Sequence, residues 1–156
     1  MAMTIFLGNP WKTFFMGEAV ACASHATLGP FQRFNEWSPW FALDPGAKYS
    51  YSGPATGVGA KMIWVGNSSI GSGSEEIIES TADGRIVNAL DFGGSQATAG
   101  YRLVTEGGGT RVTWSMDSAH PVNRWFGALL LDRVVGKDYE KGLAKLKAVL
   151  ESGPHR

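Results

Sequence analysis

The sequence PVNRWFGALLLDRVVGKDYEKGLAKLKAVLE, residues 121–151, decides the fold that we expect. Large apolar residues recur in it mostly at spacings of three and four, which places them on one face of an α-helix. They are Val122, Trp125, Phe126, Leu129, Leu130, Val134, Tyr139, Leu143, Leu146 and Leu150. Pro121 suits the first turn of this helix, and Gly153-Pro154 suits its end. Such a helix would be about 45 Å long, so it needs a large apolar partner surface.

Strand-like runs separated by turn residues precede this helix. We expect strands at residues 48–51, 60–65, 74–80, 86–92, 98–105 and 110–117. Turn sequences between them, such as Asp83-Gly84, favour an antiparallel meander. In the last of these strands Val112, Trp114 and Met116 alternate with polar residues and therefore share one face. One face of the sheet is thus apolar and rich in large rings, and the long helix is its natural cover in an α+β fold.

The N-terminal part is harder to interpret. Residues 1–8 could form a first strand, and Asn9-Pro10 has the residues of a helix start. Residues 11–27 give mixed signals, because their small residues tolerate a helix whereas Gly17 and the poor periodicity argue against one. Residues 29–45 are dense in aromatic residues and interrupted by prolines, which excludes a long helix and favours short helical turns.

The composition narrows the class of protein. A chain of 156 residues fits one domain, and we expect a single domain over residues 1–156. The 14 basic and 14 acidic residues cancel without blocks of like charge, so we expect neither a nucleic-acid partner nor a membrane span. The single cysteine, Cys22, excludes an internal disulfide and fits a reducing compartment, which favours the cytoplasm.

Four segments together resemble a known family. They are RFNEWSPWFALDP (33–45), YSGPATGVGAKMIW (51–64), GTRVTWSMD (109–117) and WFGALLLDRVVGKDYEKGLAKLKAVLE (125–151). In order and spacing they are similar to the polyketide cyclase/dehydrase branch of the START-like (SRPBCC) superfamily. The resemblance implies a helix-grip fold, in which a curved antiparallel sheet wraps around the long C-terminal helix and short helices lie near the N-terminus. It also implies a deep pocket for a small apolar or aromatic molecule. Residues 16–27 look inserted or divergent against that pattern.

The sequence shows no catalytic constellation. Its histidines, His25, His120 and His155, belong to no metal-binding pattern, so we expect no metal and no cofactor. His120, before the long helix, is the candidate general acid or base. The alternative for His120 is a ring in water at the helix N-terminus, and we favour this alternative. The catalytic residue, if there is one, is otherwise unknown.

The candidate ligand-binding residues follow from the expected facing and from the implied fold. They are Trp64, Tyr101, Trp114, Trp125 and Leu129. For each large ring the competing interpretation is plain packing in the core, since buried rings mostly just pack.

Three hypotheses of function remain open from the sequence. The first is binding of an apolar or aromatic small molecule, lipid-like or polyketide-like, between sheet and helix. The second is a cyclase or dehydratase that uses the same pocket, and a buried ionisable side chain there would favour it. The third is a protein-interaction module, which an exposed apolar patch around Trp37, Trp40 and Phe41 would favour. A homodimer also stays open.

Overall fold

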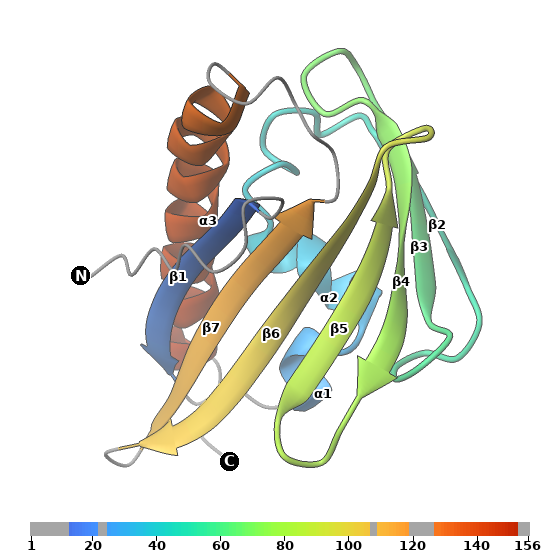
Figure 1. The fold of residues 1–156 in the computed structure, drawn as a ribbon. Coiled ribbons are helices and arrows are strands. Elements are labelled where there is room, and N and C mark those ends of the chain that lie inside the picture. The colour runs from blue at the N-terminus through green and yellow to red at the C-terminus, as the bar shows by residue number, and fades with distance from the viewer. Residues whose placement is uncertain (1–12, 22–24, 107–108, 119–126, 153–156) are drawn as a thin grey trace.

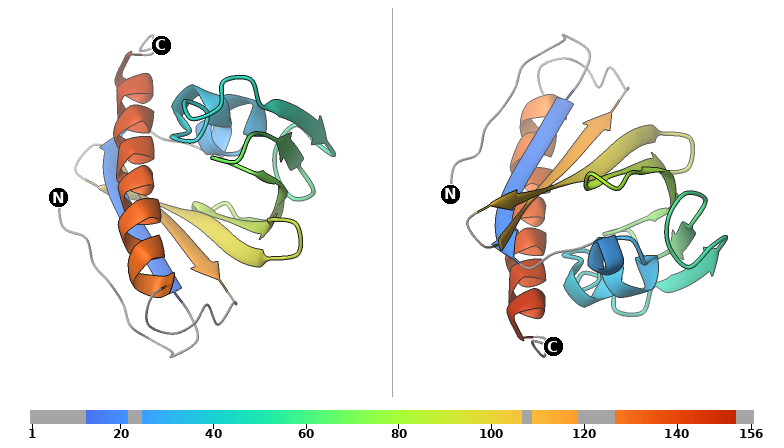
Figure 2. Two further views of the ribbon diagram at one scale, coloured as in Figure 1. Left: turned by 90° about the horizontal axis from the view of Figure 1, so that it is seen from above. Right: turned by 90° about the horizontal axis from the view of Figure 1, so that it is seen from below.

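The computed structural model describes residues 13–21, 25–106, 109–118 and 127–152. Within them one antiparallel sheet has the strand order β1-β7-β6-β5-β4-β3-β2. Its strands are β1 (Thr13–Ala21), β2 (Lys48–Ser52), β3 (Lys61–Val65), β4 (Ser72–Ser80), β5 (Arg85–Asp91), β6 (Gln96–Glu106) and β7 (Gly109–Ser118). The helices are α1 (His25–Leu28), α2 (Phe31–Trp37) and α3 (Gly127–Ser152). The sheet curves around α1 and α2, and α3 packs against β1 and α2 (Figures 1 and 2).

This arrangement confirms the α+β helix-grip fold that the sequence predicted. The six strands expected from residue 48 onward are all present, and each end lies within two residues of its expected position. α2 lies in the segment for which we expected short helical turns. The long helix is described from Gly127 to Ser152, and its expected first turn at 121–126 lies outside the described residues.

The N-terminal edge of the sheet differs from the sequence-based interpretation. The expected strand at residues 1–8 and the helix start at Asn9-Pro10 lie outside the described residues. The structure places the edge strand β1 at Thr13–Ala21, inside the segment that gave mixed signals. Pairing with β7 fixes this conformation, with Gly17 opposite Trp114. Strand geometry here depends on a partner about a hundred residues away, which local periodicity does not report.

The core lies between the concave face of the sheet and the three helices. Alternation along the strands gives this inner face its large side chains, including Met62, Trp64, Ile77, Ile86, Tyr101, Val112 and Trp114. From α3, Tyr139, Leu143 and Leu146 are buried against them, which confirms the predicted apolar face for this part of the helix. The burial of so many large side chains is the main favourable term in the stability of the fold.

Trp114 of β7 connects the sheet to α2 and α3. Its ring stacks on that of Tyr139 from α3, with centroids 3.8 Å apart and an interplanar angle of 9°. It also contacts the ring of Trp37 on α2, at 5.2 Å, and that of Trp40 in the following loop, at 5.7 Å. Gly142 of α3 permits this approach, because a Cβ there would come within 2.9 Å of the Trp114 ring and 3.1 Å of Pro39.

Gly136 and Gly142, both in α3, should therefore respond in opposite ways to replacement by alanine. Gly136→Ala should raise the free energy of unfolding by up to about 1 kcal/mol, because a Cβ there meets nothing within 4 Å and alanine favours the helix. Gly142→Ala should lower it by about 1–2 kcal/mol, because overpacking against Trp114 outweighs that gain. Urea unfolding of both variants measures the difference, and equal shifts would contradict the close packing at Gly142.

Candidate ligand site on the inner face of the sheet

Three of the five predicted ligand-binding residues lie on the inner face. Trp64, Tyr101 and Trp114 are 9, 4 and 2% exposed. Tyr101 and Trp114 are cross-strand partners on β6 and β7, and their rings stack at 5.6 Å. Trp125 and His120 lie outside the described residues, and Leu129 belongs to α3 but its side chain is not among those described. Whether these residues contact a ligand stays a prediction.

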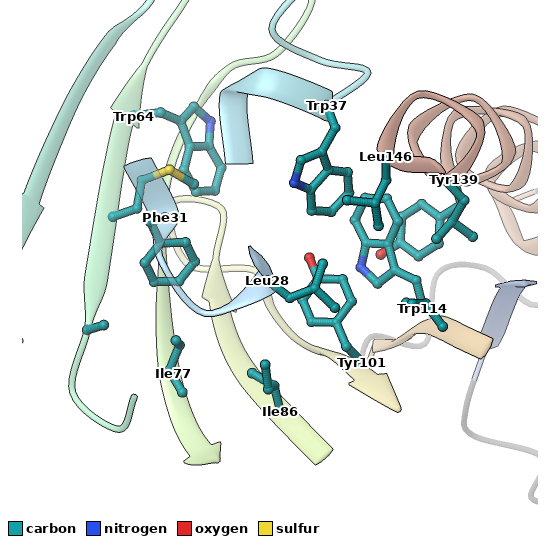
Figure 3. Packing of buried hydrophobic residues seen from close by; sticks show 14 residues of the cluster. Leu28, Phe31, Trp37, Trp64, Ile77, Ile86, Tyr101, Trp114, Tyr139 and Leu146 are labelled. Atoms are coloured by element: carbon teal, nitrogen blue, oxygen red, sulfur yellow. The ribbon is translucent and has the colours of Figure 1, made fainter. Parts of the chain in front are cut away.

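Trp64 lies at the other end of the inner face, with Trp37 between it and Trp114 in the view of Figure 3. Its Nε1 donates a hydrogen bond to the backbone oxygen of Ile70, at 3.3 Å. Gly73 on β4 faces it, and a Cβ at that position would come within 2.6 Å of the indole. The structure thus brings Tyr101 and Trp114 together and holds Trp64 by separate contacts.

A polar pair on the inner face was missed by the sequence analysis. Glu75 on β4 is 6% exposed, and Asn88 on β5 is likewise buried. Asn88 Nδ2 donates a hydrogen bond to Glu75 Oε1, at 2.6 Å. The alternation of side chains along the two strands could have indicated this pair, because Glu75 shares a face with Ile77, and Asn88 shares one with Ile86.

The protonation of this pair is set by its surroundings. Burial raises the pKa of Glu75 to about 7, and the hydrogen bond from Asn88 opposes that rise only in part. Burial also raises the pKa of Tyr101 and that of Tyr139, and the negative charge of Glu75 adds to both shifts. The carboxyl and the two phenols, from β4, β6 and α3, therefore all lie in surroundings of low polarity.

Within the described part of the chain, three buried polar atoms in this region have no hydrogen-bond partner. They are the indole nitrogens of Trp37 and Trp114 and Oδ1 of Asn88, all buried. In Figure 3 the Trp37 nitrogen turns to the Trp64 side of the ring, away from α3. A buried polar group without a partner costs about 1–3 kcal/mol. Two donors and one acceptor in the described interior thus have unused hydrogen-bonding capacity.

A hollow of about 240 Å³ opens on the concave side, between α2 and β2. Its lining includes Phe31 and Gln32 of α2, Tyr51 of β2 and Ala60 before β3. Phe31 belongs to the core cluster, so this hollow connects the surface to the edge of the aromatic interior. A second hollow, of about 560 Å³, crosses the outer face of the sheet and is lined mainly by polar side chains such as Lys61, Glu76 and Asp117.

Metal binding gains no support from the described residues, among which no group of three or more His, Cys, Asp or Glu side chains could hold an ion. In the same part of the chain, no helix is both long enough and apolar enough to cross a membrane.

The fold and the aromatic inner face define a helix-grip protein, and comparison with known proteins gives the family. Residues 18–151 match the family described as polyketide cyclase/dehydrase and lipid transport. The chain belongs to this family. The match begins inside residues 16–27, the segment that we expected to be inserted or divergent. No curated protein matches the chain.

Solved structures share the fold at low sequence identity. A protein from Nitrosospira multiformis superposes with a TM-score of 0.65 and 19% identity over 92% of this chain and 99% of its own. The di-domain ARO/CYC StfQ from the steffimycin biosynthetic pathway superposes with a TM-score of 0.63 and 12% identity, over 91% of this chain and 51% of its own. Ginseng major latex-like protein 151 from Panax ginseng superposes with a TM-score of 0.62 and 15% identity, over 90% of this chain and 98% of its own.

The raised pKa of Glu75 predicts a pH-dependent stability. Between about pH 4.5 and 7 the folded chain keeps a proton that the unfolded chain has released, so wild-type stability falls as the pH rises through this window. Glu75→Gln keeps the shape and removes the charge. It should match the wild type near pH 4.5 and exceed it above pH 7, by on the order of 3 kcal/mol. Urea unfolding of both proteins across this pH range tests the prediction. If the free energies of unfolding of wild type and Glu75→Gln changed in parallel with pH, the pKa of Glu75 would not be raised.

Proposed function

We propose that this protein binds a small apolar or aromatic molecule between the inner face of the sheet and the helices. The observation that carries the proposal is the set of unpartnered buried polar atoms among aromatic rings, on Trp37, Asn88 and Trp114. Most buried polar groups in proteins have a hydrogen-bond partner, so several unpartnered ones in one region favour a ligand that supplies it. Apolar rings would provide most of the affinity, and these atoms would orient the ligand.

Family membership supports the same proposal. The family description combines polyketide cyclisation or dehydration with lipid transport, and both activities act on largely apolar small molecules. The similar StfQ belongs to a biosynthetic pathway. The hollow between α2 and β2 would be the entrance, because it is the described hollow that reaches the core cluster from the concave side.

The interaction-module hypothesis loses its supporting feature. It required an exposed apolar patch around Trp37, Trp40 and Phe41, but Trp37 is 1% exposed and the other two are half-buried. Trp37 and Trp40 pack on Trp114. Their role is to attach α2 and the following loop to β7. A homodimer stays a prediction, which light scattering can test.

The second candidate function is a cyclase or dehydratase acting in the same site. Glu75 favours it, since a buried carboxyl with a pKa of about 7 can both accept and donate a proton near neutral pH. In this alternative Glu75, and not His120, would be the acid or base. Turnover of a polyketone that wild type cyclises and Glu75→Gln does not would establish it.

Binding can be tested by replacing an alanine with the larger leucine on the inner face or on the outer face of the sheet. Ala99 of β6 is buried on the inner face opposite Asn88, whereas Ala89 of β5 is half-buried on the outer face. Ala99→Leu should weaken the binding of naphthalene-based ligands at least about tenfold, because its side chain would take up space beside Asn88. Ala89→Leu, the matched control, should bind like wild type. Isothermal titration calorimetry measures both, after circular dichroism confirms folding.

Two results would count against the proposal. If Ala99→Leu binds as tightly as wild type, the ligand does not lie on the inner face. If wild type binds no member of a panel of aromatic and fatty ligands, and native mass spectrometry finds no small molecule on the purified protein, the chain is not a binder of this kind.

A further inference from the structure

Among the residues that the structure describes, Glu75 has a hydrogen-bond donor beside it but no positive charge. Burial and the Asn88 hydrogen bond account for its altered titration. Among the side chains that the structure describes, none of the buried ones is Lys, Arg or His. Nearby Lys61 lies on the outer face, where it forms an ion pair with Glu76 at 3.3 Å. A buried carboxylate without a counter-charge is costly, and such groups are normally paired.

The other groups near Glu75 suit a cation better than an anion. Asn88 uses Nδ2 to bind Glu75, and its Oδ1 remains an unpartnered acceptor beside the carboxyl. The phenols of Tyr101 and Tyr139 are close enough to feel the charge of Glu75. The rings of Tyr101 and Tyr139 both stack on the ring of Trp114. Faces of Trp and Tyr rings attract cations, and two acceptor oxygens side by side match the N–H donors of an ammonium group.

We propose that the inner-face site selects an aromatic ligand that carries a protonated amine. Glu75 and Asn88 Oδ1 accept its N–H groups, and the rings of Tyr101, Trp114 and Tyr139 pack on its apolar part. The inference rests on the proposed binding function and specifies the chemical class of its ligand. A neutral ligand would leave the carboxylate of Glu75 without a counter-charge. A carboxylate ligand would place a second negative charge beside Glu75.

Three ligands that share one ring system separate these cases. Naphthylethylamine is protonated at neutral pH, naphthylethanol is neutral, and naphthylpropionate is negatively charged. Wild-type protein should bind the amine at least about tenfold more tightly than the alcohol at pH 8, because the buried ion pair and two charge-assisted hydrogen bonds are added to the same apolar contact. The carboxylate should bind most weakly. Isothermal titration calorimetry gives the three dissociation constants.

The pH dependence gives an independent readout on the unmodified protein. Among the described residues, the polar groups that interact with Glu75 are Asn88, which does not titrate, and Tyr101 and Tyr139, whose pKa values are raised above their ordinary range. Below neutral pH, amine binding must therefore expel the proton of Glu75. Affinity for the amine should rise from about pH 5 to 8 while affinity for the alcohol stays constant, and calorimetry in buffers of different ionisation enthalpy should record proton release with the amine alone.

Two variants with the same change on opposite faces complete the test. Glu75→Gln should lose the preference for the amine over the alcohol. Glu76→Gln, one residue further along β4 and paired with Lys61 on the outer face, should keep the wild-type preference.

The outcomes separate the inference from the function on which it rests. Equal affinities of wild type for amine and alcohol, or a preference that survives in Glu75→Gln, would overturn the amine site while leaving small-molecule binding intact. Failure of all three ligands to bind, with the wider panel also negative, would overturn the binding function itself.

Discussion

The stack of Trp114 on Tyr139 is the contact on which the arrangement of this fold depends. One ring comes from β7, the strand next to the edge strand β1, and the other from α3, and their centroids lie 3.8 Å apart. Stacked and edge-to-face ring pairs contribute about 0.5–1.5 kcal/mol each beyond the burial of their surface. Trp114 makes such contacts with rings of α2, the loop after it, β6 and α3. A single side chain thereby fixes the distance between the sheet and two separate helical elements.

This rigid aromatic assembly has a consequence for the polar groups beside it. Glu75 is buried and accepts one hydrogen bond, from Asn88 Nδ2, and burial makes the carboxyl hold its proton up to about pH 7. An apolar pair of similar size would stabilise the fold more at neutral pH. The chain thus keeps a costly polar pair in its interior, which is where functional sites commonly hold strained or poorly solvated groups.

The predictable part of the site follows from local periodicity. Alternation in β7 places Val112 and Trp114 on the inner face, and helical spacing places Tyr139 and Leu146 on the covered face of α3, as found. Both patterns are determined by the geometry of one element, so the sequence is sufficient to read them. The edge strand β1 was harder to predict from the sequence, because small residues such as Gly17 and Ala19 adopt a strand only through pairing with β7.

By itself the sequence thus determined the meander, the long helix and the apolar faces that join them, since these depend on residue spacing within single elements. Only the tertiary structure decided that Glu75 meets Asn88. The register between β4 and β5 shifts at a bulge between Ile77 and Glu79, so counting back from the turn at Asp83-Gly84 assigns the wrong partners. A shift of one residue exchanges the two faces of a strand. The partner of the buried carboxyl on β5 therefore depends on the irregular pairing of two strands, which only the folded sheet fixes.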